Sequence, residues 1–206
     1  MPSTLYEKTT RWFERATASL VGELPCRRGC SHCCVGLFPV TVLDRQEIRR
    51  GLRFLPHEDR LVIEQKAAEQ VSLLSASTAR LTDHPFIDDW PDRDTDRLVK
   101  QFENLPCPAL KSDGSCGVYA FRPLVCRSMG IPPEVDGVVH GACRIQTSVP
   151  LIRLSPALRR EETVLAGAEA DELALLRREL GSQGEELLLP HAFLPDPDDG
   201  PCRRAT

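Results

Sequence analysis

The sequence predicts a mostly α fold with a small β element, in which helices flank a compact cysteine-rich region. Segments with apolar residues at helical spacing lie near both ends of the chain, and eight of the nine cysteines lie between residues 26 and 143 among turn-forming residues. Apolar residues make up 41% of the 206 residues, which is enough to form the buried core of a single domain.

The first predicted helix covers about residues 4–21. Thr4 and Glu7 have the spacing of a capping box, and Pro25 follows just before the first cysteines. We therefore treat residues 1–23 as an N-terminal helix. The apolar residues that recur at helical spacing are Leu5, Trp12, Phe13, Ala16 and Leu20.

Residues 37–43 are β-prone, and Pro39 makes them an edge strand or an extended segment. Asp44 and Glu47 have the spacing that opens a second helix, and a third helix is expected at about residues 58–76. We expect residues 44–80 to form a helical insert. The third helix carries its apolar face on Ile63, Ala67, Val71 and Leu74.

The stretch at residues 82–96 holds six aspartates and two prolines, and we expect a surface loop. Residues 111–115 (KSDGS) have the composition of a turn in a small hairpin, and Pro123 suits the first turn of a short helix. A last helix is predicted at residues 158–180. Its inward face would carry Ala166, Ala170, Leu173, Leu176 and Leu180.

The predicted organisation has four parts. An N-terminal helix precedes a cysteine-cluster domain at residues 24–146, a helical region follows at residues 147–194, and residues 195–206 have the polar, Pro- and Asp-rich composition of a disordered tail.

Charge and hydropathy limit the partners. The formal net charge is -4, so no basic excess indicates nucleic-acid binding. No segment has the run of about 18 apolar residues that a membrane helix needs, and the N-terminus lacks the features of a secretory signal. We expect a cytoplasmic protein that binds neither nucleic acid nor membrane. In a reducing compartment, clustered thiols are more often metal ligands than disulfides.

The first cysteine set has the spacing C-x3-C-x2-C-C. Four thiols within nine residues would repel one another as thiolates, and a bound cation removes that repulsion. This spacing predicts a metal site. Its candidate ligands are Cys26, Cys30, Cys33 and Cys34.

The second set is more widely spaced, and each member lies in a turn-like context. Four plus four cysteines match two tetrahedral zinc sites or iron–sulfur clusters, each with about four thiolates. Adjacent Cys33 and Cys34 point in different directions in most backbone conformations, so each set need not form its own site. The second set is Cys107, Cys116, Cys126 and Cys143, whereas Cys202 is expected to be a free thiol.

These residues resemble the CxxCxxCC, or YkgJ-type, cysteine-cluster family of zinc- or iron-chelating domains. The resemblance covers about residues 24–146 and includes the companions of the cysteines. The shared motifs are the group Cys26 to Cys34, then Cys107-Pro108-Ala109-Leu110, Gly114-Ser115-Cys116-Gly117-Val118-Tyr119, Arg122-Pro123-Leu124-Val125-Cys126-Arg127 and Cys143. The resemblance implies metal chelation by those eight cysteines. The acidic stretch before Cys107 departs from the family pattern.

Three companions of the cysteines are candidate cofactor-binding residues. Arg122 and Arg127 would place positive charge near thiolates, which lowers thiol pKa and offsets a negatively charged cluster. Tyr119 would pack over the site and shield it.

Two interpretations of the function stay open. In the first, the chain binds zinc or iron, and the iron could be part of an iron–sulfur cluster. The metal then stabilises a loop-rich core, and the helices carry the site or present a surface to a protein partner. In the second, the chain is an iron–sulfur-dependent enzyme related to protein lysine N-methylases. The spacing of Cys26, Cys30 and Cys33 is also that of radical S-adenosylmethionine enzymes, but no alternating β/α pattern follows it.

Overall fold

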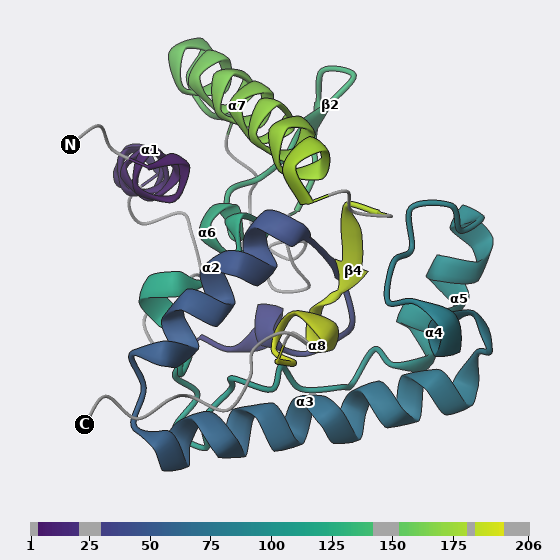
Figure 1. Ribbon diagram of the computed structural model, residues 1–206. Helices are drawn as coiled ribbons and strands as arrows, with labels where there is room; N and C mark the ends of the chain where they lie inside the picture. Colours follow the sequence, from purple (N-terminus) through teal and green to yellow (C-terminus); the bar gives the residue numbers. More distant parts are fainter. Residues whose placement is uncertain (1–3, 21–29, 142–152, 181–183, 196–206) are drawn as a thin grey trace.

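A computed structural model describes residues 4–20, 30–141, 153–180 and 184–195, and it confirms a predominantly α fold with a small β element. The α-helices are α1 (Leu5–Ser19), α2 (Val42–Arg53), α3 (His57–Ser77), α4 (Arg80–Asp83), α5 (Asp92–Gln101), α6 (Leu124–Ser128), α7 (Pro156–Leu180) and α8 (Leu189–Ala192). Two 3₁₀ helices, η1 (His32–Cys34) and η2 (Tyr119–Phe121), accompany the strands β1 (Pro39–Thr41), β2 (Glu134–Val135), β3 (Val138–Val139) and β4 (Glu186–Leu188). Figure 1 shows α3 and α7 at opposite sides of the molecule, with α2, β4 and α8 between them.

Helix α1 begins as the sequence predicts. The Thr4 hydroxyl accepts a hydrogen bond from the Glu7 backbone N–H, and the Glu7 carboxylate accepts one from the Thr4 N–H, so both arms of the capping box are present. Trp12 and Ala16 are buried and pack against residues of the α7 region, and the Trp12 indole N–H donates to the Leu158 carbonyl oxygen at 2.9 Å. This face holds α1 against α7.

Helix α2 begins two residues before the predicted start. Thr41 has an extended backbone and is the N-cap, and Asp44 is the third helical residue that completes the capping box. The prediction that Asp44 is the first residue of the capping box was therefore wrong, because Asp44 is the last residue of a box that Thr41 begins. One oxygen of the Asp44 carboxylate accepts from the Thr41 N–H, and the other oxygen is available for further contacts.

The short strands join distant parts of the chain. β1 pairs antiparallel with β4, with Val40 opposite Leu187. Leu187, Leu189 and Phe193 are each at most 2% exposed and belong to the largest apolar cluster, together with residues of α2 and α3. The segment after α7 therefore completes the core that α2 and α3 begin. Burial of this apolar surface is the main source of stability for the fold.

Two expectations about the acidic stretch and the last helix need correction. Residues 82–96 are not one loop, because α4 ends within them and α5 begins at Asp92. Aspartates in the first turn of α5 favour the helix dipole, and buried Leu98 anchors the helix. In α7, Leu176 is buried, but Ala166 and Ala170 are exposed, because the N-terminal half of α7 faces α1 through Leu165 and Ala168 instead.

The expected hairpin at KSDGS is reduced to a turn with one bridge between Leu110 and Cys116. The expected tail lies almost entirely outside the described residues, as does the side chain of Leu180. Across the described part of the chain, no helix combines the length and the apolar character needed to cross a membrane.

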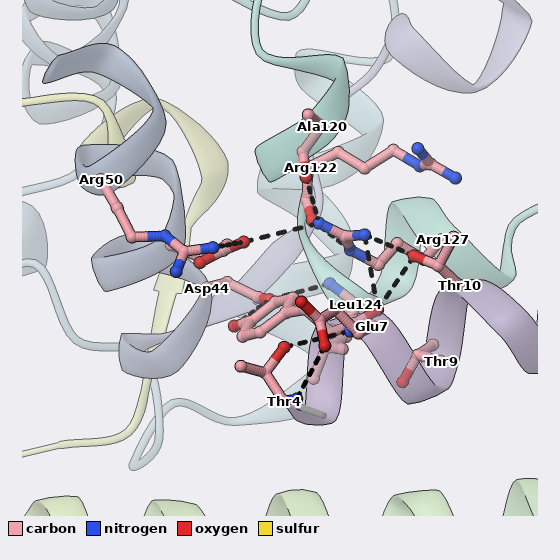
Figure 2. A network of polar contacts seen from close by, with 12 residues as sticks. Thr4, Glu7, Thr9, Thr10, Asp44, Arg50, Ala120, Arg122, Leu124 and Arg127 are labelled. Carbon is pink, nitrogen blue, oxygen red and sulfur yellow. Dashed lines mark hydrogen bonds and ion pairs between the residues drawn. The ribbon is translucent and has the colours of Figure 1, made fainter. Parts of the chain in front are cut away.

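A buried polar network connects α1, α2 and α6 (Figure 2). The Asp44 carboxylate, 2% exposed, accepts hydrogen bonds from the Tyr6 hydroxyl at 3.1 Å and from the Leu124 backbone N–H at 2.8 Å. The Arg127 guanidinium donates to the carbonyl oxygens of Arg122 and Ala120 at 2.9 and 2.7 Å, and its cationic group lies 3.6 Å from the Glu47 carboxylate. These contacts satisfy buried charges and fix the position of α6.

We predict that Gly51→Ala destabilises the protein, because a Cβ on Gly51 would lie 2.5 Å from the Cβ of Phe121. The helix α2 would have to move away from η2, at a cost of about 1–3 kcal/mol in unfolding free energy. Gly167→Ala is the matched control, since Gly167 also lies within a helix but has open space around it, and the change should stabilise by up to about 1 kcal/mol. Chemical denaturation of both variants measures this. Equal effects of the two substitutions would contradict the close contact.

We also predict that buried His191 makes stability fall in acid. The side chain is 5% exposed, and burial lowers its pKa from 6.5 to about 4, against the opposing effect of a backbone contact at Leu188. Below pH 6.5 the unfolded chain takes up the proton first, so up to about 3 kcal/mol of stability is present above pH 6.5 and lost as the pH falls towards 4.

The measurement is the unfolding free energy of wild-type protein and His191→Leu from pH 7 to pH 4. The difference in unfolding free energy between the two proteins should change over this range, because only the wild type has the buried histidine. Any loss of metal in acid is common to both and cancels in this difference. Exposed His84→Gln serves as the control and should follow the wild type. Parallel pH dependence of wild type and His191→Leu would refute the prediction.

Candidate metal centre

The two cysteine sets meet where the segment after η1 lies beside residues 105–107. The backbone N–H of Cys107 donates to the Cys34 carbonyl oxygen at 2.7 Å, and Val35 forms a β-bridge with Pro106. Gly36 continues this pairing by donating its N–H to Leu105 at 2.8 Å, with a positive φ of 114° that favours glycine. Backbone hydrogen bonds therefore bring Cys33 and Cys34 of the first set next to Cys107 of the second.

Cys107 and Cys116 lie on the two arms of one tight turn. The Lys111 N–H donates to the Ser115 carbonyl oxygen at 2.9 Å, and Gly114 has a φ of 80°. The Gly117 N–H then donates to the Ala109 carbonyl oxygen at 2.8 Å, which keeps the arms together. Both cysteines are half-buried and pack against the largest apolar cluster, so the turn is anchored in the core.

Cys126 comes from the short helix α6. Five residues cannot form a stable helix alone, so the position of Cys126 depends on the network around Asp44 and Arg127 described above. Pro123 is the N-cap of this helix, one residue before the first-turn position that the sequence suggested.

Five thiols from these three segments are close enough to affect one another electrostatically. Burial raises the pKa of Cys126 well above its usual value, and the charges of Cys107, Cys33 and Cys116 raise it further. The pKa of Cys34 is raised by its hydrogen bond to Cys33, by burial and by the charges of Cys33, Cys107 and Cys116. The structure therefore brings together Cys33, Cys34, Cys107, Cys116 and Cys126.

The described residues do not place the remaining predicted ligands in this group. Cys30 is a free, half-buried thiol at the edge of a described segment. Cys26 and Cys143 lie outside the described residues, as does Cys202.

One thiol of the group ionises more readily than the others. The Cys34 thiol donates a hydrogen bond to Cys33 and lowers the pKa of Cys33 to about 6, against the opposing effect of burial. Burial raises the pKa of Cys107 to about 12 and also raises that of Cys116. Ionisation is therefore easiest at Cys33, and burial together with the charges of neighbouring thiols opposes further thiolates in the group.

The donor set fits a thiophilic metal. Among the described residues, no three potential ligands already converge as a metal ion requires. The thiols are nevertheless gathered and free of disulfides, and thiolate donors are suited to zinc and to iron–sulfur clusters. Side-chain rearrangement and loss of thiol protons would have to accompany coordination.

The three candidate companions lie in different environments. Arg122 is 9% exposed, its guanidinium lies 4.1 Å from the centre of the Tyr119 ring, and its charge helps to lower the pKa of Cys33. No carboxylate among the described residues forms an ion pair with Arg122. Tyr119 is 64% exposed and covers Arg122, while the guanidinium of Arg127 is turned to the buried network.

Sequence reasoning missed the residues that support the site. Asp44 was recognised only as a helix-capping residue and Tyr6 was not singled out, yet their contact across 38 positions helps to hold α6 and thus Cys126. The capping-box spacing pointed to Asp44, but no local pattern indicates a hydrogen bond between residues so far apart in the chain.

Comparison with known proteins supplies the family. No curated protein and no solved structure matches this chain. A family model described as "CxxCxxCC: Putative zinc- or iron-chelating domain" matches residues 25–144, which is more than half of the chain and includes all five gathered thiols. The chain therefore belongs to the CxxCxxCC family of zinc- or iron-chelating domains.

Proposed function

We propose that this protein binds zinc or iron through eight cysteines and that the bound metal holds the cysteine loops in place. The observation that carries the proposal is the gathering of five thiols from three segments up to 93 positions apart, from Cys33 to Cys126. Apolar packing alone does not require several thiols at one point, whereas a metal ion does. The ligands would be Cys26, Cys30, Cys33, Cys34, Cys107, Cys116, Cys126 and Cys143.

The contact between the two cysteine sets supports mixed membership of the sites. Cys33 and Cys34 both interact electrostatically with thiols of the second set, so the two sets need not form separate centres. Eight thiolates suit two tetrahedral zinc ions or iron–sulfur clusters. We favour iron, because the first set is denser than the well-separated pairs usual in zinc sites.

Arg122 is proposed to balance the charge of the thiolate centre. A centre with four thiolates and one divalent cation carries two negative charges. A nearly buried arginine that pairs with no carboxylate of the described residues would offset part of them. Tyr119 would keep this guanidinium in place and limit its contact with water. Arg127 would act indirectly, by holding the helix that carries Cys126.

An iron–sulfur-dependent enzyme related to protein lysine N-methylases is the second candidate function. The C-x3-C-x2-C spacing of Cys26, Cys30 and Cys33 favours it. The described residues form helices and short antiparallel pairs, which do not resemble the β/α barrel of radical S-adenosylmethionine enzymes. We therefore place chelation first. The free thiols are consistent with a cytoplasmic protein and with a protein partner, and both remain part of this proposal.

Anaerobic purification, followed by metal analysis and an optical spectrum, tests the proposal. Visible absorption with stoichiometric iron and sulfide would support a cluster, and colourless protein with stoichiometric zinc would support a structural zinc site. Protein that is folded yet free of both metals, and that takes up neither, would contradict chelation. Calorimetry of the iron-loaded protein with S-adenosylmethionine tests the radical enzyme in particular, because such an enzyme must bind this cofactor whereas a chelating domain need not.

We predict that Arg122→Gln weakens metal binding by about tenfold, corresponding to about 1.4 kcal/mol, because one positive charge beside the thiolates is lost. The melting temperature of the metal-free protein should change little. Arg127→Gln should instead lower the melting temperature clearly and change metal affinity less, because five acceptors, three of them buried, lose their donor. Competition with a chromophoric chelator gives the affinity, and equal effects of the two variants on affinity and melting would contradict these separate roles.

We further predict that Cys33→Ser and Cys126→Ser lose metal and expose residues 30–141 to protease. Coordination of structural zinc supplies roughly 10–16 kcal/mol in small peptides, so removal of one ligand should outweigh any change in packing. Cys202→Ser removes one sulfur atom outside the matched family domain and is the control. Metal analysis and limited proteolysis give the result. If both ligand variants kept full metal content and protection, their role as ligands would be excluded.

A further inference from the structure

A cavity of about 280 Å³ lies where α1, β1, α6 and α7 meet, apart from the gathered thiols. Its walls are largely apolar and include the Trp12 ring, Val40 and Leu165. Small-molecule sites usually measure about 300–1,000 Å³, so this cavity has room for a compact ligand of a few carbon atoms.

The polar groups of the cavity carry charge of one sign. Four carboxyl groups line it, from Asp44, Glu162, Glu169 and Glu186, and no lysine, arginine or histidine of the described residues does so. Acidic groups on open surface would simply be solvated. Here they line a recess together with the buried Trp12 ring, where Glu169 is half-buried and Glu186 is exposed at the surface.

Two of the four carboxyl groups are already satisfied. Asp44 accepts hydrogen bonds from Tyr6, Leu124 and Thr41, and Glu162 forms an ion pair with Arg159 at 2.6 Å. The side chains of Glu169 and Glu186 have neither a hydrogen bond nor an ion pair with a described residue. Burial raises the pKa of Glu169, and the charges of Asp44, Glu172 and Glu186 raise it further. A cation between them would relieve this repulsion.

We propose that the cavity binds a primary alkylammonium group, with its carbon atoms against Trp12 and Leu165 and its ammonium between Glu169 and Glu186. An ammonium has three donors and suits carboxylates that approach from different sides, whereas the apolar walls favour a ligand with an alkyl chain. A hydrated metal ion would gain no favourable contact from the apolar walls. The site is independent of the proposed metal function.

The same chemistry occurs in a free alkyl diamine and in a lysine side chain of a peptide. A diamine would enter the cavity alone, and a lysine would enter while its backbone stays on the surface. The experiment therefore contains both, as 1,4-diaminobutane and as an acetylated, amidated pentapeptide with a central lysine.

The test uses the fluorescence of Trp12 in the full-length protein as purified, with Trp90→Phe so that Trp12 is the single tryptophan. Saturable changes are expected with 1,4-diaminobutane or the lysine peptide, and none with 1,4-butanediol or the matching glutamine peptide. Tighter binding of the diamine would identify a free amine as the ligand, and tighter binding of the peptide would identify lysine.

Variants locate the binding. Glu169→Gln should weaken amine binding by about tenfold, since one charge-assisted contact is lost. Glu179→Gln removes the same charge from an exposed position of α7 and should leave affinity unchanged. Ala166→Leu fills the cavity without changing its charge and should abolish binding, which keeps the test valid if Glu169→Gln folds poorly. Equal binding of amine and diol, no saturable change with either amine, or full affinity in Ala166→Leu would overturn the proposal.

Discussion

Mutual repulsion of buried thiolates is the constraint on which this structure depends. Five thiols affect one another electrostatically, and a hydrogen bond, burial and neighbouring charges together raise the pKa of four of them. A metal ion changes this balance because its positive charge stabilises several thiolates at once. In the function proposed above, metal binding and release of thiol protons form one coupled event, and the surrounding fold must tolerate both charge states.

The scaffold meets this constraint with backbone pairing and a buried ionic network. Backbone hydrogen bonds hold the first set beside Cys107, and the contacts of Asp44 and Arg127 hold the helix of Cys126. None of these bonds involves a sulfur atom, so they hold the segments independently of the metal that we propose to fix the cysteine loops. Arg122 differs from Asp44 and Arg127, because its positive charge lowers the pKa of nearby thiols and forms no ion pair with a carboxylate of the described residues. Different residues therefore assemble the site and stabilise its charge.

Local patterns in the sequence predict what depends on neighbours in the chain. The capping box of Thr4 and Glu7, the helical spacing in α1 and α3 and the cysteine motifs were sufficient for the fold class and the family, while the individual ligands stay a prediction. Contacts between distant segments could not be predicted from these local patterns. The pairing of β1 with β4, the bond between Tyr6 and Asp44, and the helix α5 within an acidic stretch all depend on tertiary packing that outweighs local preference. The same holds for Arg127, whose motif is shared with Arg122 but whose guanidinium faces the buried network.

The central claim is that cysteine sulfur atoms hold a metal in this protein, and X-ray absorption at the metal edge of the purified protein tests it most directly. The edge identifies zinc or iron, and the fine structure gives the kind and distance of the nearest atoms. We predict about four sulfur neighbours per metal at about 2.3 Å. A nearest shell made of oxygen and nitrogen, with no sulfur, would contradict the claim.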